Sequence, residues 1–255
     1  MEDEACSRQL QHFPKFRALA KEVEACLQVF EHAKEWSDYV SGLTRLIKVF
    51  QRAEFCDAAK VGDLSVIPDK ATIARRLAQS VNPILPNGVH RKALDAYRVI
   101  LSRLGRDQLA LDLSLWSQGL FSLFPHANEE CKLFELKLLA DSFLPLGPHL
   151  IPCLDGLLLA LLPGIEDEQT SFYQPSLVLL QDIHAAVGRR EFFRSLWWSL
   201  QCCVGARLPS LFLLHSSIVQ AGGLHVPGVL SCRDTVVDAL IKALQDSSIL
   251  VQRNV

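Results

Sequence analysis

Apolar residues recur at the spacing of an α-helix along most of the chain. In segment 36–50 they occupy positions i, i+3, i+4, i+7, i+10, i+11 and i+14, which form one face of a helix of about four turns. Segment 13–30 carries a similar amphipathic pattern, and a polar linker, 54–66, follows the second helix. No segment shows the clear alternation of a half-buried strand. These patterns predict a chain built of helices.

Capping residues, prolines and glycines predict where the other helices begin and end. Asp69 is predicted to be the N-cap of a helix that buries Ile73, Leu77 and Val81, and Asn87-Gly88 is predicted to open the next helix. Further helices are expected near 107–124, 127–144, 148–163, 174–187, 190–204, 208–220 and 234–245. About eleven helices with short connections predict an all-α fold, an irregular HEAT/armadillo-like helical-repeat solenoid. A single globular helical domain is the alternative, because the repeats are irregular in sequence.

The two ends of the chain lead to separate expectations. Residues 1–10 are acidic and polar, which excludes secretory and mitochondrial targeting, and we expect them to form a tail before a helical domain over 11–255. A last helix begins near Ser248 and is cut at Val255, which is too short to cover the inner face of the helix before it. We therefore expect a fragment of a longer protein, whose C-terminal edge exposes an apolar face. The residues expected on that face are Val236, Leu240 and Leu244 or their neighbours.

Two apolar stretches, 143–165 and 208–232, have the composition of possible membrane spans. Prolines and glycines interrupt both stretches, and Asp155 lies within the first. We expect both to form core helices. The aromatic residues Phe192, Phe193, Trp197 and Trp198 are likewise interpreted as core packing.

Composition excludes several classes of protein. With 49% hydrophobic and 21% charged residues the chain is not a disordered protein, and a net charge of −2 does not suit a polycation built for nucleic acid. The eight cysteines include no C-x-x-C spacing and no convergence with histidines, so we interpret them as reduced, mostly buried thiols and expect no metal site. They are Cys6, Cys26, Cys56, Cys131, Cys153, Cys202, Cys203 and Cys232.

Catalytic chemistry has little support in the sequence. Phosphate-binding, dinucleotide-binding, zinc-protease and nucleophile-elbow motifs do not occur. The acidic groups 129–130 and 166–168 lie where helix starts or loops are expected, and His184 lies near the apolar face of its helix. We therefore predict a protein that is not an enzyme and binds no cofactor. Two alternatives stay open: a helical-repeat module that binds protein without lipid contact and, less favoured, an enzyme of unfamiliar fold.

Charge is distributed unevenly along the chain. Segment 69–106 holds eight basic and two acidic residues, whereas 126–170 holds eight acidic and two basic residues, net charges of +6 and −6. We predict that part of the basic segment forms one face that meets an anionic phosphoinositide headgroup or an acidic partner. Two alternatives stay open: the charges are ordinary solvated helix faces, or the arginines pair with carboxylates of 126–170. The candidate residues are Arg75, Arg76, Arg91 and Lys92.

Several segments together resemble one known family. The segment VIPDKATIARRLAQSVNPILPNGVHRKALDAYRVIL (66–101) is similar to the conserved N-terminal region of the Dopey family, and 35–50, 109–127, 143–168 and 207–217 resemble it in the same order. The closing LQDSSILVQRNV matches as well, whereas 218–232 matches poorly.

The resemblance implies a very large cytosolic protein of α-helical repeats, peripherally attached to Golgi and endosome membranes. There it implies action in traffic between endosome and Golgi. The implied partners are a large Mon-type, Arf-exchange-factor-like scaffold and phospholipid flippases. The long remainder of a Dopey protein is absent from this sequence, so contacts made by that remainder cannot be assigned to residues of this chain.

Overall fold

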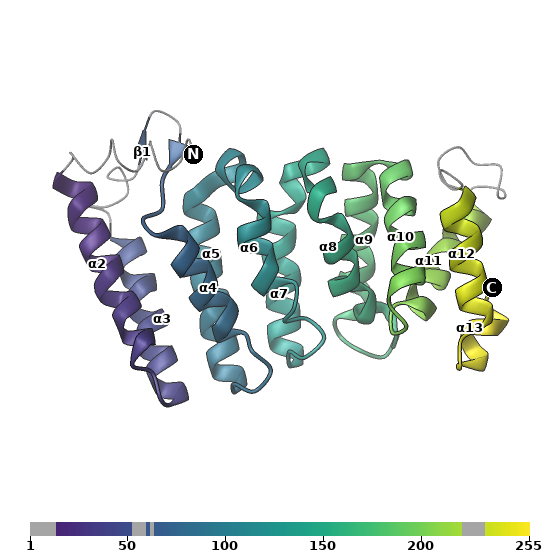
Figure 1. Ribbon diagram of the computed structural model, residues 1–255, viewed down its shortest axis with the longest axis horizontal. Coiled ribbons are helices and arrows are strands. Elements are labelled where there is room, and N and C mark those ends of the chain that lie inside the picture. The colour runs from purple at the N-terminus through teal and green to yellow at the C-terminus, as the bar shows by residue number, and fades with distance from the viewer. Residues whose placement is uncertain (1–13, 53–59, 62–63, 221–232) are drawn as a thin grey trace. The chain divides into compact units, whose positions relative to one another are not determined.

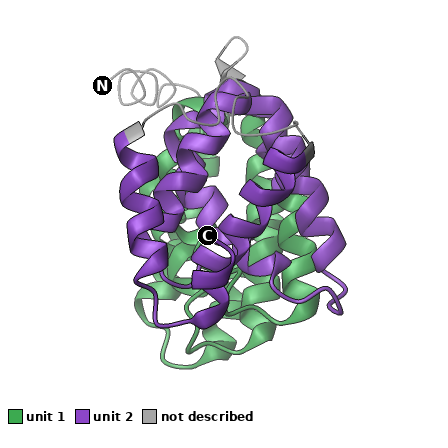
Figure 2. Ribbon diagram, turned by 90° about the vertical axis from the view of Figure 1, so that its right-hand side faces the viewer, with its two compact units in different colours: residues 1–138 green, residues 139–255 purple. Residues whose placement is uncertain are grey.

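The computed structural model describes residues 14–52, 60–61, 64–220 and 233–255, and the predicted all-α fold is confirmed (Figure 1). Within these ranges the only strands are two-residue β1 (Lys60–Val61) and β2 (Leu64–Ser65), an antiparallel pair in the predicted polar linker. The chain divides into two compact units, residues 1–138 and 139–255, which Figure 2 shows in green and purple. Within each unit most helices pack against another helix that is close in sequence, which is compatible with helical repeats.

Unit 1 is built from six helices, the last of which continues across the unit boundary. They are α2 (Pro14–Glu31), α3 (Trp36–Gln51), α4 (Lys70–Ser80), α5 (Asn87–Leu111), α6 (Leu113–Leu120) and α7 (Glu129–Ser142). Helix α3 packs against both α2 and α5, and α4 packs against α5 and α6. The starts of α2, α3 and α5 agree with the sequence prediction to within one residue.

The predicted buried faces of α4 and α5 are confirmed. Ile73, Leu77 and Val81 are at most 1% exposed, and so are most of the apolar residues predicted along α5. Asp69 does precede α4, but its side chain makes no capping hydrogen bond and its φ of 47° lies in the left-handed region. The prediction of its position was right and that of its capping role was wrong.

The predicted single helix over 107–124 is wrong. Gly105, with a φ of 72°, bends α5 before that helix was expected to start, and α5 then continues to Leu111. A second break follows at Asp112, whose carboxylate accepts hydrogen bonds from Lys70 Nζ at 2.7 Å and Gln108 Nε2 at 3.1 Å. Asp112, which is hydrogen-bonded to Lys70 of α4, thus lies at the break between α5 and α6. The bend at Gly105 lies where one predicted helix ends and the next was expected to begin, whereas the apolar pattern runs through Asp112 and did not reveal that break.

Unit 2 is centred on α10, which contacts α8, α9, α11 and α12. Its elements are the 3₁₀ segment η2 (Leu144–Cys153), α8 (Leu154–Leu161), the 3₁₀ segment η3 (Leu162–Ile165), α9 (Tyr173–Val187), α10 (Arg189–Cys202), α11 (Arg207–Gln220), α12 (Arg233–Leu244) and α13 (Ile249–Arg253). Phe192, Phe193 and Trp197 are buried in its core, as predicted, and Trp198 is half-buried.

The predicted helix over 148–163 is regular only in its second half. Gly147 has a φ of 59°, and Pro148 and Pro152 lie inside η2, so this part is 3₁₀ and α8 begins only at Leu154. By length and composition alone, Leu144–Ile165 is apolar enough to cross a membrane, with a mean hydropathy of 1.5 and half of the window buried. It packs against α9 and α10, and its one charged residue, Asp155, lies 3.2 Å from Arg194 on α10.

Helices α12 and α13 expose apolar side chains, as expected for Leu244 and for the neighbours of Val236 and Leu240 but not for Val236 and Leu240 themselves. Val236 is buried at 7% exposure and Leu240 is half-buried, whereas Leu244 is 56% exposed. The other exposed apolar residues of these two helices are Val237, Ile241, Ile249 and Leu250.

Candidate functional site

The four predicted basic residues do not form one set of free cations. Arg75 is exposed on α4, and its Nη2 lies 3.4 Å from Thr72 Oγ1. Arg76 is half-buried and donates to Gln79 Oε1 at 3.0 Å, with its Nη2 at 3.9 Å from Glu31 on α2. Arg76 thus lies toward the neighbouring helix rather than toward solvent.

Arg91 is held by a residue of the acidic segment. Its Nη1 lies 2.6 Å from Glu130 Oε1, and its guanidinium lies 4.3 Å from the centre of the Phe134 ring. The guanidinium of Arg98 lies 5.1 Å from the same ring. The alternative in which arginines pair with carboxylates of 126–170 is therefore confirmed for Arg91. Lys92, also half-buried, has no ion pair to another described residue.

Other cations of the basic segment also hold helices together. Lys70 pairs with Asp112 at 2.7 Å, and Arg103 Nη1 donates to the carbonyl of Phe50 near the end of α3 at 2.6 Å. A basic side chain that donates to a carbonyl in the last turn of a helix is also attracted to the negative end of the helix dipole, which stabilises the contact. Several basic residues of segment 69–106 are thus paired with groups of other helices in unit 1.

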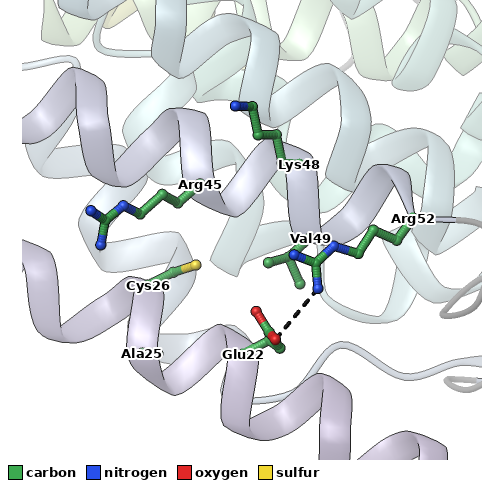
Figure 3. A pocket seen from close by; sticks show the side chains of 7 residues that line it. All are labelled: Glu22, Ala25, Cys26, Arg45, Lys48, Val49 and Arg52. Atoms are coloured by element: carbon green, nitrogen blue, oxygen red, sulfur yellow. Dashed lines mark ion pairs between the residues drawn. The ribbon is translucent and has the colours of Figure 1, made fainter.

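A second basic cluster lies at a pocket between α2 and α3, hereafter the α2–α3 pocket, of about 260 Å³ (Figure 3). Helix α2 supplies one acidic and two small side chains, and α3 with its C-terminal cap supplies three cations and a valine. The lining residues are Glu22, Ala25, Cys26, Arg45, Lys48, Val49 and Arg52.

The lining of the α2–α3 pocket carries three cations and one carboxylate. Arg52 Nη1 lies 3.4 Å from Glu22 Oε1, and both side chains are 45% exposed, so the pair contributes little to stability. Arg45 and Lys48 are exposed and form no ion pair with another described residue. In Figure 3 the Arg45 guanidinium extends from α3 on the side of Cys26, whereas Arg52 points to Glu22. The arrangement suits an anion, because guanidinium and ammonium groups donate charge-assisted hydrogen bonds.

Cys26 forms a neutral part of the pocket wall. Burial, and secondarily the carboxylate of Glu22, raise the pKa of the Cys26 thiol, while Arg45 and Arg52 act in the opposite direction. The thiol is therefore protonated at neutral pH and adds no negative charge that would repel an anion.

Sequence reasoning missed the α2–α3 pocket although one signal was available. Arg45, Lys48 and Arg52 are spaced i, i+3 and i+7, which places them along one side of α3. Counting net charge over long segments hid this spacing.

The described residues show no catalytic arrangement that the sequence had overlooked. No group of three or more His, Cys, Asp or Glu side chains within them could hold a metal ion. His184 packs in the core edge as interpreted, with its ring centre 4.7 Å from that of Phe192 and 5.5 Å from that of Phe193. Burial, and secondarily Arg189, lower the pKa of His184, which favours the neutral ring.

The described cysteines are all free thiols, as interpreted, but not all are buried. Cys26 and Cys131 are buried, Cys153 and Cys203 are half-buried, and Cys202 is exposed. Burial raises the pKa of Cys153 to about 12. The other three cysteines, Cys6, Cys56 and Cys232, lie outside the described residues.

Comparison with known proteins identifies relatives along most of the chain. The model of the Dopey N-terminal domain matches residues 13–255. The chain is 34% identical to Protein DOP1B of Xenopus laevis over 243 residues, which cover 94% of the chain and 10% of that protein. It is 38% identical to Protein pad-1 of Caenorhabditis elegans over 203 residues, 79% of the chain and 8% of that protein. It is 30% identical to Protein DOP1 of Saccharomyces cerevisiae over 201 residues, 77% of the chain and 11% of that protein.

The chain thus spans about a tenth of the length of the curated relatives it matches. No solved structure matches it. A family model that covers nearly the whole chain, and relatives at 30–38% identity from yeast, nematode and frog, agree with one another. The chain therefore belongs to the Dopey family, through the N-terminal domain of that family.

Proposed function

We propose that this chain is part of a non-catalytic helical scaffold in membrane traffic between endosome and Golgi. In this proposal it acts at the cytosolic face of trans-Golgi network and endosome membranes as a peripheral protein. Its match to the Dopey N-terminal domain over residues 13–255 is the observation that carries the proposal. The proposed partners are a large Mon-type, Arf-exchange-factor-like scaffold and a phospholipid flippase, and nucleic acid is not among them.

The proposed membrane contact uses four basic side chains of unit 1 that form no ion pair with another described residue. Arg45 and Lys48 lie at the α2–α3 pocket, and Arg75 and Lys92 lie on α4 and α5. A basic side chain near an anionic leaflet contributes about 1 kcal/mol. Four such side chains would contribute about 4 kcal/mol, a factor of roughly a thousand in affinity, if all four reached one leaflet. Salt should weaken this contact, because exposed charges are screened.

The second candidate is a helical-repeat module that binds protein without touching lipid. The ion pairs Arg91–Glu130 and Lys70–Asp112 favour it, because they use basic residues to connect helices within unit 1. In that case the remaining cations would meet carboxylates of a protein partner instead of lipid headgroups.

Vesicle flotation separates the two candidates. The purified chain is mixed with phosphatidylcholine vesicles with and without phosphoinositide, at low and at physiological salt. Arg91 is left unchanged, because a glutamate there would face Glu130 and endanger the fold. The test variants are Arg75→Glu with Lys92→Glu, and Arg45→Glu with Lys48→Glu. The control, Arg189→Glu with Arg190→Glu, makes the same change of charge on exposed residues of unit 2.

Lipid contact predicts salt-sensitive flotation that depends on phosphoinositide. One or both test variants should reduce it about tenfold or more, since two charge reversals remove at least two contributions of about 1 kcal/mol. The control variant should float as the wild type does, and thermal melts should show that all variants fold. Flotation that is absent, or equal in test and control variants, would contradict lipid contact and favour the protein-binding module.

A further inference from the structure

Unit 2 contains a pocket of about 250 Å³ between η3, the start of α9, α11 and the end of α13, hereafter the η3–α11 pocket. Contacts of α11 with both η3 and α13 hold its walls together. Its lining combines apolar side chains with two carboxylates and contains no lysine or arginine. The lining residues are Ile165, Glu166, Glu168, Tyr173, Leu208, Pro209, Phe212, His215 and Asn254.

The apolar side of the η3–α11 pocket is formed mainly by Phe212, a partly exposed aromatic residue on a helix whose neighbouring side chains are buried. Phe212 is 41% exposed, whereas Leu211, Leu213 and Leu214 beside it are buried and fix α11 in the core. Ile165 forms a buried wall at 5% exposure. An exposed aromatic side chain on a rigid support is typical of the residues that dominate binding at protein interfaces.

The acidic side of the pocket is a turn with a fixed backbone. Asp167 Oδ1 accepts a hydrogen bond from the Gln169 N–H at 2.9 Å, and the Asp167 carbonyl accepts one from Thr170 Oγ1 at 2.9 Å. Glu166 and Glu168 flank Asp167, and all three side chains are exposed. The carboxylates of Glu166 and Glu168, which line the pocket, therefore lie at its rim.

Tyr173 connects the acidic side to the pocket interior. Its phenol oxygen lies 3.5 Å from Glu168 Oε1. Burial, and secondarily the charge of Glu168, raise the pKa of Tyr173, so its hydroxyl keeps its proton at neutral pH. The hydroxyl therefore keeps the proton that it donates to Glu168, and it helps to position the carboxylate that would hold a cation.

We propose that the η3–α11 pocket binds a segment of a partner protein in which an apolar side chain stands next to a lysine or arginine. The apolar side chain packs on Phe212 and Ile165, and the basic group pairs with Glu168. The pocket volume is below the usual range of about 300–1,000 Å³ for cofactor and small-molecule sites, which suits a single side chain.

Charge decides between a protein and other large partners. Glu166, Asp167 and Glu168 would repel both an anionic leaflet and a nucleic acid backbone. A basic residue of a protein segment is attracted by the same carboxylates. The proposed pocket therefore differs in ligand class from the basic residues of unit 1, and it does not depend on lipid binding.

Selection from a random peptide library on phage would test the proposal. The intact chain serves as bait, and the Phe212→Asp variant is used for counter-selection. We expect the enriched peptides to carry an apolar residue adjacent to Lys or Arg. A labelled synthetic copy of one enriched peptide is then titrated by fluorescence polarisation against the wild type and single variants.

The expected losses of affinity follow from the two sides of the pocket. Phe212→Ala should weaken the peptide about tenfold or more, as removal of a central aromatic contact commonly does. Glu168→Gln should weaken it several-fold and reduce its dependence on salt. The matched control is Val219→Ala, which truncates a 63% exposed apolar residue on the same helix and should leave affinity unchanged. Thermal melts confirm that each variant folds.

Four results would overturn the proposal. They are failure to enrich any peptide over the counter-selection, enrichment of peptides without the apolar–basic pattern, equal effects of Phe212→Ala and Val219→Ala, and self-association of the chain through this face. Analytical ultracentrifugation of the wild type and Phe212→Asp tests the last of these. None of the four bears on vesicle flotation, so failure here leaves the proposed function standing.

Discussion

Replacing the buried carboxyl of Glu135 with an apolar side chain should stabilise unit 1. Glu135 on α7 is fully buried, and neither of its oxygens has a hydrogen-bond partner among the described residues. Burial raises the pKa of Glu135 well above its ordinary value of 4.5, and Lys132 only partly opposes this. The folded chain therefore holds the carboxyl in its neutral form, with its polar atoms removed from water.

The gain from Glu135→Met has a constant part and a part that depends on pH. Burial of an unpaired neutral polar group costs about 1–3 kcal/mol, which the variant recovers at every pH. Because the folded-state pKa is raised, the folded state also binds its proton more tightly than the unfolded state does. The associated stability is fully present below pH 4.5 and is lost as pH rises through the folded-state pKa, by about 1.4 kcal/mol for each pH unit.

Urea denaturation followed by far-UV circular dichroism measures both parts. The wild type, Glu135→Met and Glu135→Gln are compared at several values between pH 4.5 and 8, and the transition that includes α7 is fitted. Glu24→Gln, which changes an exposed carboxyl of α2, is the matched control. The advantage of Glu135→Met over the wild type should grow with pH, and Glu24→Gln should show no such growth. A constant difference across the range, or a variant less stable than the wild type throughout, would refute the reasoning.

Two further changes test contacts within single units. Gly119→Ala should lower the free energy of unfolding by about 1–3 kcal/mol or more, because the added Cβ would lie 2.5 Å from Ala78 Cβ and 2.7 Å from Tyr97 Oη; an unchanged urea midpoint would contradict this close packing. Asp246→Asn should lower the melting temperature of unit 2 at neutral pH, since Asp246 accepts hydrogen bonds from the Ser248 N–H at 2.7 Å and from Arg207 at 2.5 Å. These bonds lower the pKa of Asp246 in the folded state. The stability that the Asp246 carboxylate contributes is therefore fully present above pH 3.8, the ordinary value, and is lost as pH falls through the folded-state pKa. The melting temperatures of the wild type and Asp246→Asn should therefore converge as pH falls from neutral to acidic. A constant difference would argue against the hydrogen bonds of the Asp246 carboxylate.

The sequence was most informative about features that depend on neighbours along one helix. The buried faces of α3 and α5 follow from residues three and four apart. The α5 face was predicted correctly, and so was the α3 face from Leu43 onward, whereas Trp36, the first residue of the predicted face, is 58% exposed. The same spacing identified His184 as a packed side chain on α9. Such features need no knowledge of which helix lies opposite.

Features that depend on a distant partner were not predictable in the same way. Arg91 and Glu130 are 39 residues apart, so their ion pair exists only once α5 and α7 are packed. The α2–α3 pocket requires the faces of two helices to be known together. The break at Asp112 and the 3₁₀ segment η2 interrupt apolar patterns that continue through them, so periodicity alone extended the helices over 107–124 and 148–163 too far.

The apolar stretch Leu144–Ile165 has a consequence for synthesis of the chain. Its Asp155 pairs with Arg194 on α10. Arg194 is synthesised 29 residues after Ile165, the last residue of the apolar stretch. At roughly 5–20 residues per second, that delay is about 1.5–6 s. During it, a segment as apolar as a membrane span is exposed without the helix that covers it and with its carboxylate unpaired. Chaperones that bind nascent chains should therefore engage this segment before they engage any helix of unit 2 that follows it.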